Sequence, residues 1–414
     1  MSSSTIGHML VAGTALWASV HLPAQHVPQM ATGLPAGPLA VGFHREWVID
    51  PSRVWERSEH LADLQGAVAR PVRIDVWYPS TGGGACRQMT LRDFLYAQPP
   101  DAYFASANVY IQKWDEDSLR GFAKNLNMPF DRLLSPMSGA CLDAPVGTSR
   151  YPLVVYSGGW YNRSPDNIAL AEYLASFGYV VAEIPLFGAG LWTGDLTSNP
   201  VALETQVRDL ETAIGALSAH EWVDRTHAAA MGYSSGGIVA LLLGGRHPLI
   251  RAVVGLDPSY STDPAKVLSS SLFKAETVQI PVLTLRAGHP TYTVRDRSAV
   301  INAMRFADRY TADVGRGVHG DFGDDVVLEV ALSLGVRAEA RTTDEGIAAY
   351  RAAVSAVRLF LDGVLRDQIG ALEELATPKG DTLRMTRMPA AARPAKGITA
   401  GPAAAALRRS GRAR

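Results

Sequence analysis

The stretch THAAAMGYSSGGIVALLL, residues 226–243, decides the fold predicted for this chain. Residues 226–231 suit a buried strand, and the apolar run at 237–243 suits a helix. The Gly-x-Ser-x-Gly pattern between them predicts a sharp strand–turn–helix, in which glycines are needed because larger flanking side chains would collide. Such a turn lifts the Ser234 hydroxyl clear of the sheet edge, where it is available as a nucleophile.

A serine nucleophile of this kind needs a general base, and three histidines follow Ser234 in the chain. His247 lies at the far end of the helix that Ser234 starts, so we expect it to be structural. His289 follows an apolar strand, where it is either a substrate contact or a solvated loop residue. His319 lies in a glycine-flanked loop after the last strand-like stretch and before a long helix predicted at residues 344–365. That place suits a general base, so we predict His319 for this role.

The third member of such a triad is a carboxylate that lies between the serine and the histidine in the chain. Asp257 directly follows the apolar run 250–256, whereas Asp296 lies in the loop after the next predicted strand, residues 280–285. Either carboxylate could hold the imidazole tautomer and stabilise the imidazolium. Asp296 lies several residues beyond its strand and between two arginines, where a solvated ion pair is the simpler interpretation. We therefore predict Asp257 as the acid.

Stabilising an oxyanion needs two backbone amides, one of them from the residue after the nucleophile, here Ser235. The second is expected from the loop after an earlier strand, which we place at residues 151–156. That strand runs into SGGW, residues 157–160, where glycines allow the backbone to approach a substrate. Trp160 N–H is the predicted second donor, and an ordinary glycine turn is the alternative. Only the backbone of Ser235 is expected to take part, so its hydroxyl is not expected to be required.

The composition indicates a globular protein and excludes several functional classes. The chain has 414 residues, 47% of them hydrophobic and 19% charged, which is typical of a protein with a large core. A net charge of −1 provides no global field for nucleic acid or anionic lipid. No apolar stretch reaches membrane-spanning length. Phosphate-binding GxxxxGK[ST], HExxH and paired CxxC motifs are missing from the sequence, so neither a nucleotide nor a metal cofactor is implied.

The two ends of the chain differ in composition from its middle. The N-terminal segment, residues 1–37, contains an apolar stretch at 9–20 of signal-peptide length, but no lysine or arginine precedes it and no clean cleavage site follows. Export to the periplasm or the medium and a cytoplasmic location therefore both stay open. Residues 377–414 are rich in Ala, Pro and Arg, which predicts a disordered tail.

A single domain is predicted for residues 38–376. Strands near 42–49 and 72–78, followed by alternating strands and helices from residue 151, predict a mostly parallel sheet covered on both faces. Its site should lie at the carboxyl ends of the strands.

An aromatic-rich insertion at residues 79–149 interrupts this domain. We interpret the insertion as a helical cap over the pocket, and a loop packed elsewhere is the alternative. Cys86 and Cys141 bracket it and would form a disulfide if the protein is exported, but two separate thiols otherwise.

These motifs resemble those of the α/β-hydrolase group that contains dienelactone hydrolase-like bacterial proteins and plasma-type platelet-activating-factor acetylhydrolases. The likeness covers about residues 38–370 and rests on VGF at Val41, DPSR at Asp50, VRIDVWYP at Val72, PLVVYSGGW at Pro152, LAEYLASFGYVVAEIP at Leu170, LETQVRDLE at Leu203, GYSSGG at Gly232, AVVGLDPS at Ala252 and VHGDFGD at Val318.

In that group the acid follows the strand after the nucleophile helix, which is the position of Asp257. The histidine precedes a short Phe-x-Asp sequence, which here corresponds to His319 with Phe322 and Asp324. Members often carry His-Gly where this chain has two glycines at residues 158–159.

The resemblance and the residues together predict an α/β-hydrolase fold and a serine hydrolase that cleaves a small-molecule carboxylic ester through an acyl-enzyme. In this reading Ser234 attacks, His319 moves the proton and Asp257 orients His319, without a cofactor. An amidase, thioesterase or acyltransferase with the same machinery stays an alternative, and so does a protein that binds an apolar ligand without turnover. The sequence does not indicate the acyl group, the alcohol or the oligomeric state.

Overall fold

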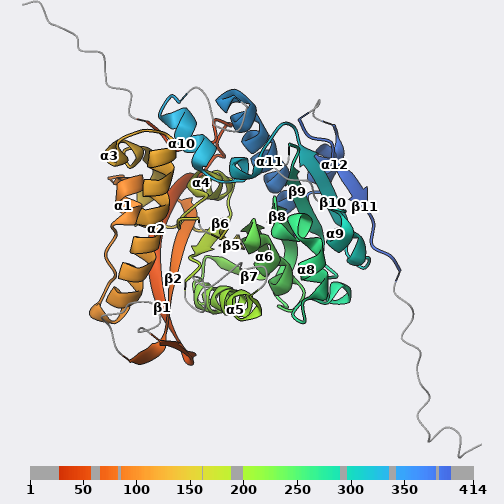
Figure 1. Ribbon diagram of the computed structural model, residues 1–414, viewed down its shortest axis with the longest axis horizontal. Coiled ribbons are helices and arrows are strands. Elements are labelled where there is room, and N and C mark those ends of the chain that lie inside the picture. Colours follow the sequence, from red (N-terminus) through yellow and green to blue (C-terminus); the bar gives the residue numbers. More distant parts are fainter. Residues whose placement is uncertain are drawn as a thin grey trace, which may run out of the picture.

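A computed structural model describes residues 28–56, 66–82, 85–160, 162–187, 199–289, 296–334, 342–378 and 382–392. Within these residues an 11-stranded sheet runs through the centre of the molecule in the order β11-β10-β9-β8-β7-β5-β6-β2-β1-β4-β3 (Figure 1). The strands are β1 (Ala40–Glu56), β2 (Ala67–Ser80), β3 (Gln88–Thr90), β4 (Met137–Leu142), β5 (Tyr151–Ser157), β6 (Val180–Ile184), β7 (Val223–Tyr233), β8 (Ile250–Leu256), β9 (Val282–Ala287), β10 (Arg309–Val314) and β11 (Thr386–Met388).

The helices of the described residues lie between these strands in the chain. They are α1 (Leu91–Leu95), α2 (Ala105–Asn125), α3 (Phe130–Leu133), α4 (Ile168–Ser176), α5 (Pro200–Leu217), α6 (Ser235–Gly244), α7 (Ser259–Thr262), α8 (Pro264–Ser269), α9 (Ala299–Ala303), α10 (Asp325–Ala331), α11 (Thr343–Leu365) and α12 (Ile369–Ala376), with short 3-10 helices that include η5 (His319–Phe322). Among these residues, no helix is long and apolar enough to cross a membrane.

The middle of the sheet is parallel, from β6 through β5, β7, β8 and β9 to β10. β2 pairs antiparallel with β6 at one side of this parallel part, and β1 pairs antiparallel with β2. After β5 the chain adds β6 on one side and then returns to add β7 on the other side. The strand order therefore reverses between β5 and β7, and such a reversal opens a crevice at the carboxyl ends of the two strands.

Alternating side chains of the central strands face two separate hydrophobic clusters. Val154 and Tyr156 of β5 belong to the cluster that includes α4 and α11. Leu153 and Val155 belong to the cluster that includes α5 and α6. Because successive strand residues point to opposite faces, both faces of the sheet are buried under helices, as predicted.

The insertion at residues 79–149 forms β3, β4 and helices α1 to α3. β4 pairs with β1, and β3 pairs with β4, so the insertion extends the sheet at its β1 edge. Phe94 of α1 packs its ring 4.8 Å from that of Phe43 in β1. Trp114 of α2 donates from Nε1 to the carbonyl of Asn162 at 3.1 Å, which connects α2 to the loop after β5. That the insertion caps a pocket stays a prediction.

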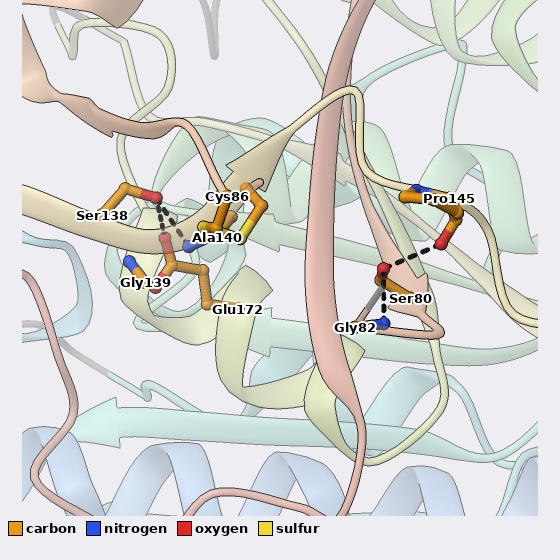
Figure 2. Close-up of a disulfide and its surroundings, with 9 residues drawn as sticks. Ser80, Gly82, Cys86, Ser138, Gly139, Ala140, Pro145 and Glu172 are labelled. Carbon is orange, nitrogen blue, oxygen red and sulfur yellow. Dashed lines mark hydrogen bonds between the residues drawn. A yellow bond between two sulfur atoms is a disulfide. The ribbon is translucent and has the colours of Figure 1, made fainter. Parts of the chain in front are cut away.

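The two cysteines of the chain form a disulfide, Cys86–Cys141, which joins the segment before β3 to β4 (Figure 2). Close to it, the Glu172 carboxylate of α4 accepts hydrogen bonds from the Ser138 hydroxyl and, at 2.9 Å, from the Gly139 N–H (Figure 2). Burial raises the pKa of Glu172 to about 7. The strand β4 is thus held to the body of the protein by side-chain contacts as well as by strand pairing.

The stretch 382–392 is ordered, so the prediction of disorder from residue 377 onward is wrong there. β11 pairs antiparallel with β10, and Arg309 of β10 donates to the Pro389 carbonyl at 2.9 Å. The physical reason is the edge of β10, whose backbone groups would otherwise lack strand partners on one side. Residues 393–414 lie outside the described residues, as does the apolar stretch at 9–20.

We expect the disulfide to stabilise the folded state by about 4 kcal/mol on the chain-entropy model, because it closes a loop across a sequence separation of 55. Urea unfolding of the oxidised protein and of the double variant Cys86→Ser/Cys141→Ser measures this difference. Thiol titration of denatured, unreduced protein is the control. Two reactive thiols in that titration would contradict the bridge.

Candidate active site

The turn between β7 and α6 holds Ser234 in a backbone conformation that non-glycine residues rarely adopt, with φ 54° and ψ −121°. Hydrogen bonds keep it there. Ser234 N–H donates to the carbonyl of Leu256 at 3.0 Å, and its own carbonyl accepts from Gly237 N–H at 3.1 Å and Ser259 N–H at 2.8 Å. The strain is therefore imposed by the surrounding backbone.

The glycines around Ser234 are required by backbone packing. A Cβ on Gly232 would lie 2.0 Å from the Gly236 carbonyl oxygen, and a Cβ on Gly236 would lie 2.0 Å from the Ser157 carbonyl oxygen. Both distances are far below any real Cβ contact. The start of α6 thus packs directly against the ends of β7 and β5, which agrees with the steric reason predicted from the sequence.

The structure brings Ser234, His319 and Asp257 together. His319 Nε2 lies 3.1 Å from Ser234 Oγ, and its Nδ1 lies 2.6 Å from Asp257 Oδ2. His319 is delivered by η5, after β10, and Asp257 directly follows β8. The Tyr233 ring stacks on the imidazole at 4.9 Å between centroids, and its hydroxyl donates to the His319 carbonyl at 3.0 Å. The ring is therefore held at both nitrogens and on one face.

The Asp257 carboxylate is buried and its two oxygens have different partners. Oδ2 faces His319, whereas Oδ1 accepts from Ala287 N–H at 2.8 Å and lies 3.6 Å from the Arg297 guanidinium. Because a carboxylate only accepts, the imidazole nitrogen that faces it must carry the proton. The other nitrogen of His319 is then free to accept a proton from Ser234.

The remaining candidates lie elsewhere. Asp296 is exposed, and its carbonyl accepts from Ala299 N–H at 3.1 Å. His289 is also exposed, although its N–H donates to the carbonyl of Gly317 at 3.0 Å, in the loop that carries His319. His247 lies after α6, where Nδ1 accepts from Leu249 N–H at 3.3 Å, which fits the structural role predicted for it.

The loop after β5 lies directly against the nucleophile turn. A Cβ on Gly159 would lie 2.9 Å from Tyr233 Cδ1 and 3.1 Å from Ser234 Cβ, so the missing side chain of glycine allows this close approach. Trp160 N–H, the predicted oxyanion donor, donates to the hydroxyl oxygen of Ser235 at 2.9 Å. This side-chain contact was missed at the sequence level, because nothing in the pattern Gly-x-Ser-x-Gly indicates where the second variable side chain points.

Buried carboxylates accept hydrogen bonds from the loop after β5 and hold it in place. Asp166 Oδ2 accepts from Gly159 N–H at 3.3 Å and from the Asn162 side chain at 2.9 Å. Glu183 Oε1 accepts from the Ser164 hydroxyl at 2.9 Å and from Asp166 N–H at 3.0 Å. Burial raises the pKa of both carboxyl groups, and the charge of Asp166 raises that of Glu183 further. Movement of the loop would leave these buried groups without partners, which is costly.

The insertion takes part in the same network. Arg73 is buried and donates from Nη2 to the Ser164 carbonyl at 2.8 Å, and it forms an ion pair with Asp75 at 3.2 Å. Asp115 of α2 accepts from Ser164 N–H at 2.8 Å, and burial raises its pKa to about 7. The helix α2 therefore helps to fix the loop that carries Trp160.

The loop of His319 is joined to α4 by the two residues singled out in the resemblance. Asp324 accepts from the backbone N–H groups of Ile168 and, at 3.2 Å, Ala169, at the start of α4. The Phe322 carbonyl accepts from the Asn167 side chain at 2.8 Å. Burial raises the pKa of Asp324 to about 7 despite these donors. Among the residues that the structure covers, no group of three or more His, Cys, Asp or Glu side chains could hold a metal ion.

Comparison with family models gave no match, and neither did comparison with curated proteins. Among solved structures, the chain is similar to one titled ferulic acid esterase from Streptomyces cinnamoneus, with a TM-score of 0.59 and 19% identity over 87% of this chain and 100% of that one. The chain has the α/β-hydrolase fold. At this identity the likeness shows the fold alone, so the dienelactone hydrolase-like subgroup stays a prediction.

We expect Asp257→Asn to lower turnover by up to about 10⁴-fold with folding largely intact, because an amide at this position would stabilise the wrong imidazole tautomer. Asp296→Asn is the control and should cost little, since that side chain is exposed. Steady-state kinetics of the two variants decide between them. If Asp296→Asn loses most of its turnover while Asp257→Asn keeps full activity, the choice of Asp257 as the acid is refuted.

We expect Asp324→Asn to flatten the dependence of stability on pH. Because the pKa of Asp324 is raised to about 7 in the folded protein, its contribution to stability is present below its ordinary pKa of 3.8 and is lost as pH rises through about 7. In urea unfolding at pH values from about 4 to 8, the free energy of unfolding of the variant should rise relative to that of the wild type as pH rises. A constant difference in unfolding free energy across that range would contradict the raised pKa.

Proposed function

We propose that this chain is a serine hydrolase that cleaves carboxylic esters through an acyl-enzyme intermediate. The observation that carries the proposal is the hydrogen-bonded chain from Ser234 through His319 to Asp257. It lies at the reversal of strand order between β5 and β7, beside the backbone of Trp160. Nucleophile, base and orienting acid are within the distances that proton transfer requires.

In the proposed acylation step, Ser234 Oγ attacks the acyl carbon while His319 Nε2 takes its proton. The backbone amide of Ser235 stabilises the tetrahedral oxyanion. The Trp160 amide, predicted as the second donor, donates to the Ser235 hydroxyl in the structure. The imidazolium then gives its proton to the leaving alcohol, and the acyl group stays on Ser234. Water, activated by His319, releases the acid in the second half of the reaction, while Asp257 keeps the imidazole in place throughout.

The substrate class is inferred from two sources. The structural neighbour is titled an esterase, and the motif resemblance is to groups that act on lactones and acetyl esters. Both favour an ester over an amide, although the machinery itself suits both. An amidase, thioesterase or acyltransferase therefore remains the main alternative, and a ligand-binding protein without turnover is the alternative from another class.

A groove of about 480 Å³ lies where α2 meets the loops of the site, and it is lined by residues that include Trp114, Ser118, Phe122, Asn162 and Asp325. Asn162 belongs to the loop that carries Trp160, and Asp325 follows the loop that carries His319. We propose that the insertion acts through this groove and receives one substituent of the ester there. The groove is lined by aromatic, amide, hydroxyl and carboxylate side chains, which suit an apolar group that carries hydrogen-bond donors.

We expect Ser234→Ala to lower ester turnover by about 10⁴-fold or more, because the nucleophile and its base act as a unit. The measurement is hydrolysis across aryl esters of increasing acyl length, with an anilide and a thioester of the same acyl group. Ser269→Ala, an exposed serine at the end of α8, is the matched control and should behave as the wild type.

Two outcomes would contradict the proposal. Full activity of Ser234→Ala would remove the nucleophile from its role. Faster turnover of the anilide or the thioester than of every ester would replace the ester hydrolase by one of the alternatives.

A further inference from the structure

The side chain of Ser235 occupies an unexpected place beside the reacting groups. It is buried, with 3% of the residue exposed, and its Oγ accepts the Trp160 N–H at 2.9 Å. The amide of Trp160, expected to face a substrate directly, is thus directed at a hydroxyl group. We propose that this hydroxyl is itself an oxyanion donor, polarised by the Trp160 amide behind it. The inference deepens the proposed ester hydrolysis and rests on it.

Counting donors and acceptors supports this assignment. A serine hydroxyl has one proton to donate and two lone pairs to accept with. One lone pair of Ser235 Oγ takes the Trp160 N–H, which leaves the proton for another acceptor. In the part of the chain that the structure describes, Ser235 Oγ donates to no protein group. A buried hydroxyl proton without a protein acceptor is suited to an acceptor that arrives with the substrate.

The location of the Ser235 hydroxyl fits the role of an oxyanion donor. The hydroxyl belongs to the residue directly after Ser234, and its backbone N–H is the other predicted donor. It also contacts Trp160, whose neighbour Gly159 packs so closely that a Cβ there would lie 3.1 Å from Ser234 Cβ. The hydroxyl thus contacts the backbone of the loop that packs against Ser234, and it belongs to the residue that follows the nucleophile. The oxygen of an acyl carbon bonded to Ser234 Oγ would come within reach of it.

The expected contribution of the Ser235 hydroxyl to catalysis follows from the charge that develops on the carbonyl oxygen of the substrate. A hydroxyl that accepts a hydrogen bond becomes a better donor, because the two bonds polarise each other. The carbonyl oxygen of the substrate gains negative charge as the transition state and the tetrahedral intermediate form, so the donation strengthens there. No proton leaves Ser235 in this role. Loss of one such donor typically lowers kcat by about 10² to 10³-fold and changes substrate binding little.

The test compares Ser235→Ala with the wild type on an ester and on its thionoester, in which sulfur replaces the carbonyl oxygen. We expect kcat on the oxygen ester to fall by about 10²-fold, with KM changed by about twofold or less. The ratio of ester to thionoester turnover should also fall, because sulfur accepts hydrogen bonds poorly and gains less from the donor. Ser235→Thr, which keeps a hydroxyl, should recover part of the lost rate.

Ser176→Ala removes a serine of α4 that is equally buried, with 3% exposed, and lies outside the site. It should leave both the rate and the ester to thionoester ratio unchanged. The proposal is overturned if Ser235→Ala keeps kcat within about twofold. It is also overturned if Ser235→Ala loses the same factor on both substrates, since a merely structural role for the hydroxyl would do that.

The rate of labelling by a fluorophosphonate separates this proposal from the proposed function. That probe develops negative charge on a phosphoryl oxygen in the same place and needs no ester turnover. Slower labelling of Ser235→Ala supports the donor. If Ser235→Ala is labelled and turns over esters as fast as the wild type, the proposed hydroxyl donor is overturned and the serine hydrolase is not. A wild-type protein that neither labels nor turns over esters overturns the serine hydrolase, and the donor with it.

Discussion

The close packing of backbone at the end of the central strands is the constraint on which the site depends. Gly232, Gly236 and the carbonyl of Ser157 approach one another so closely that no side chain fits between them. This packing keeps Ser234 at a positive φ, with its Oγ 3.1 Å from His319 Nε2. The nucleophile is therefore placed by β5, β7 and α6 together, before any of its polar partners is considered.

The polar partners come from loops, and buried carboxyl groups hold those loops in place. Asp166 and Glu183 hold the loop after β5, and Asp324 holds the loop after β10. Burial raises the pKa of all three groups, because an ionised carboxylate is costly to remove from water. Such groups add little net stability, but they disfavour any rearrangement that would leave them unpaired. Burying these carboxyl groups thus costs stability, but it gives the loops a defined geometry.

Much of this arrangement could be predicted from the sequence because it depends on local patterns. The apolar run at residues 250–256 becomes β8 with the same ends, and the helix expected at 344–365 begins one residue earlier, at Thr343. Chain order and strand ends pointed to His319 and to two possible acids, and the arginines beside Asp296 together with the family resemblance favoured Asp257. The structure places Asp257 in contact with His319.

The features that sequence missed depend on contacts between distant segments. β11 forms because the edge of β10 needs a partner, and a three-residue strand carries almost no pattern of its own. The hydroxyl of Ser235 meets Trp160 across 75 positions of sequence, so no spacing rule could indicate the contact. The insertion was recognised by its aromatic residues, but its packing on β1 follows from three-dimensional contacts of Phe94 and its neighbours.

The central claim is that an acyl group is transferred to Ser234. The most direct measurement is mass spectrometry of the protein quenched in acid during turnover of a slowly deacylated aryl ester, followed by peptide mapping. We expect a mass increase equal to the acyl group, located on Ser234 and missing when His319 is replaced by Ala. An acyl adduct on Ser235 or on another residue, or turnover of the ester without any covalent adduct, would contradict it.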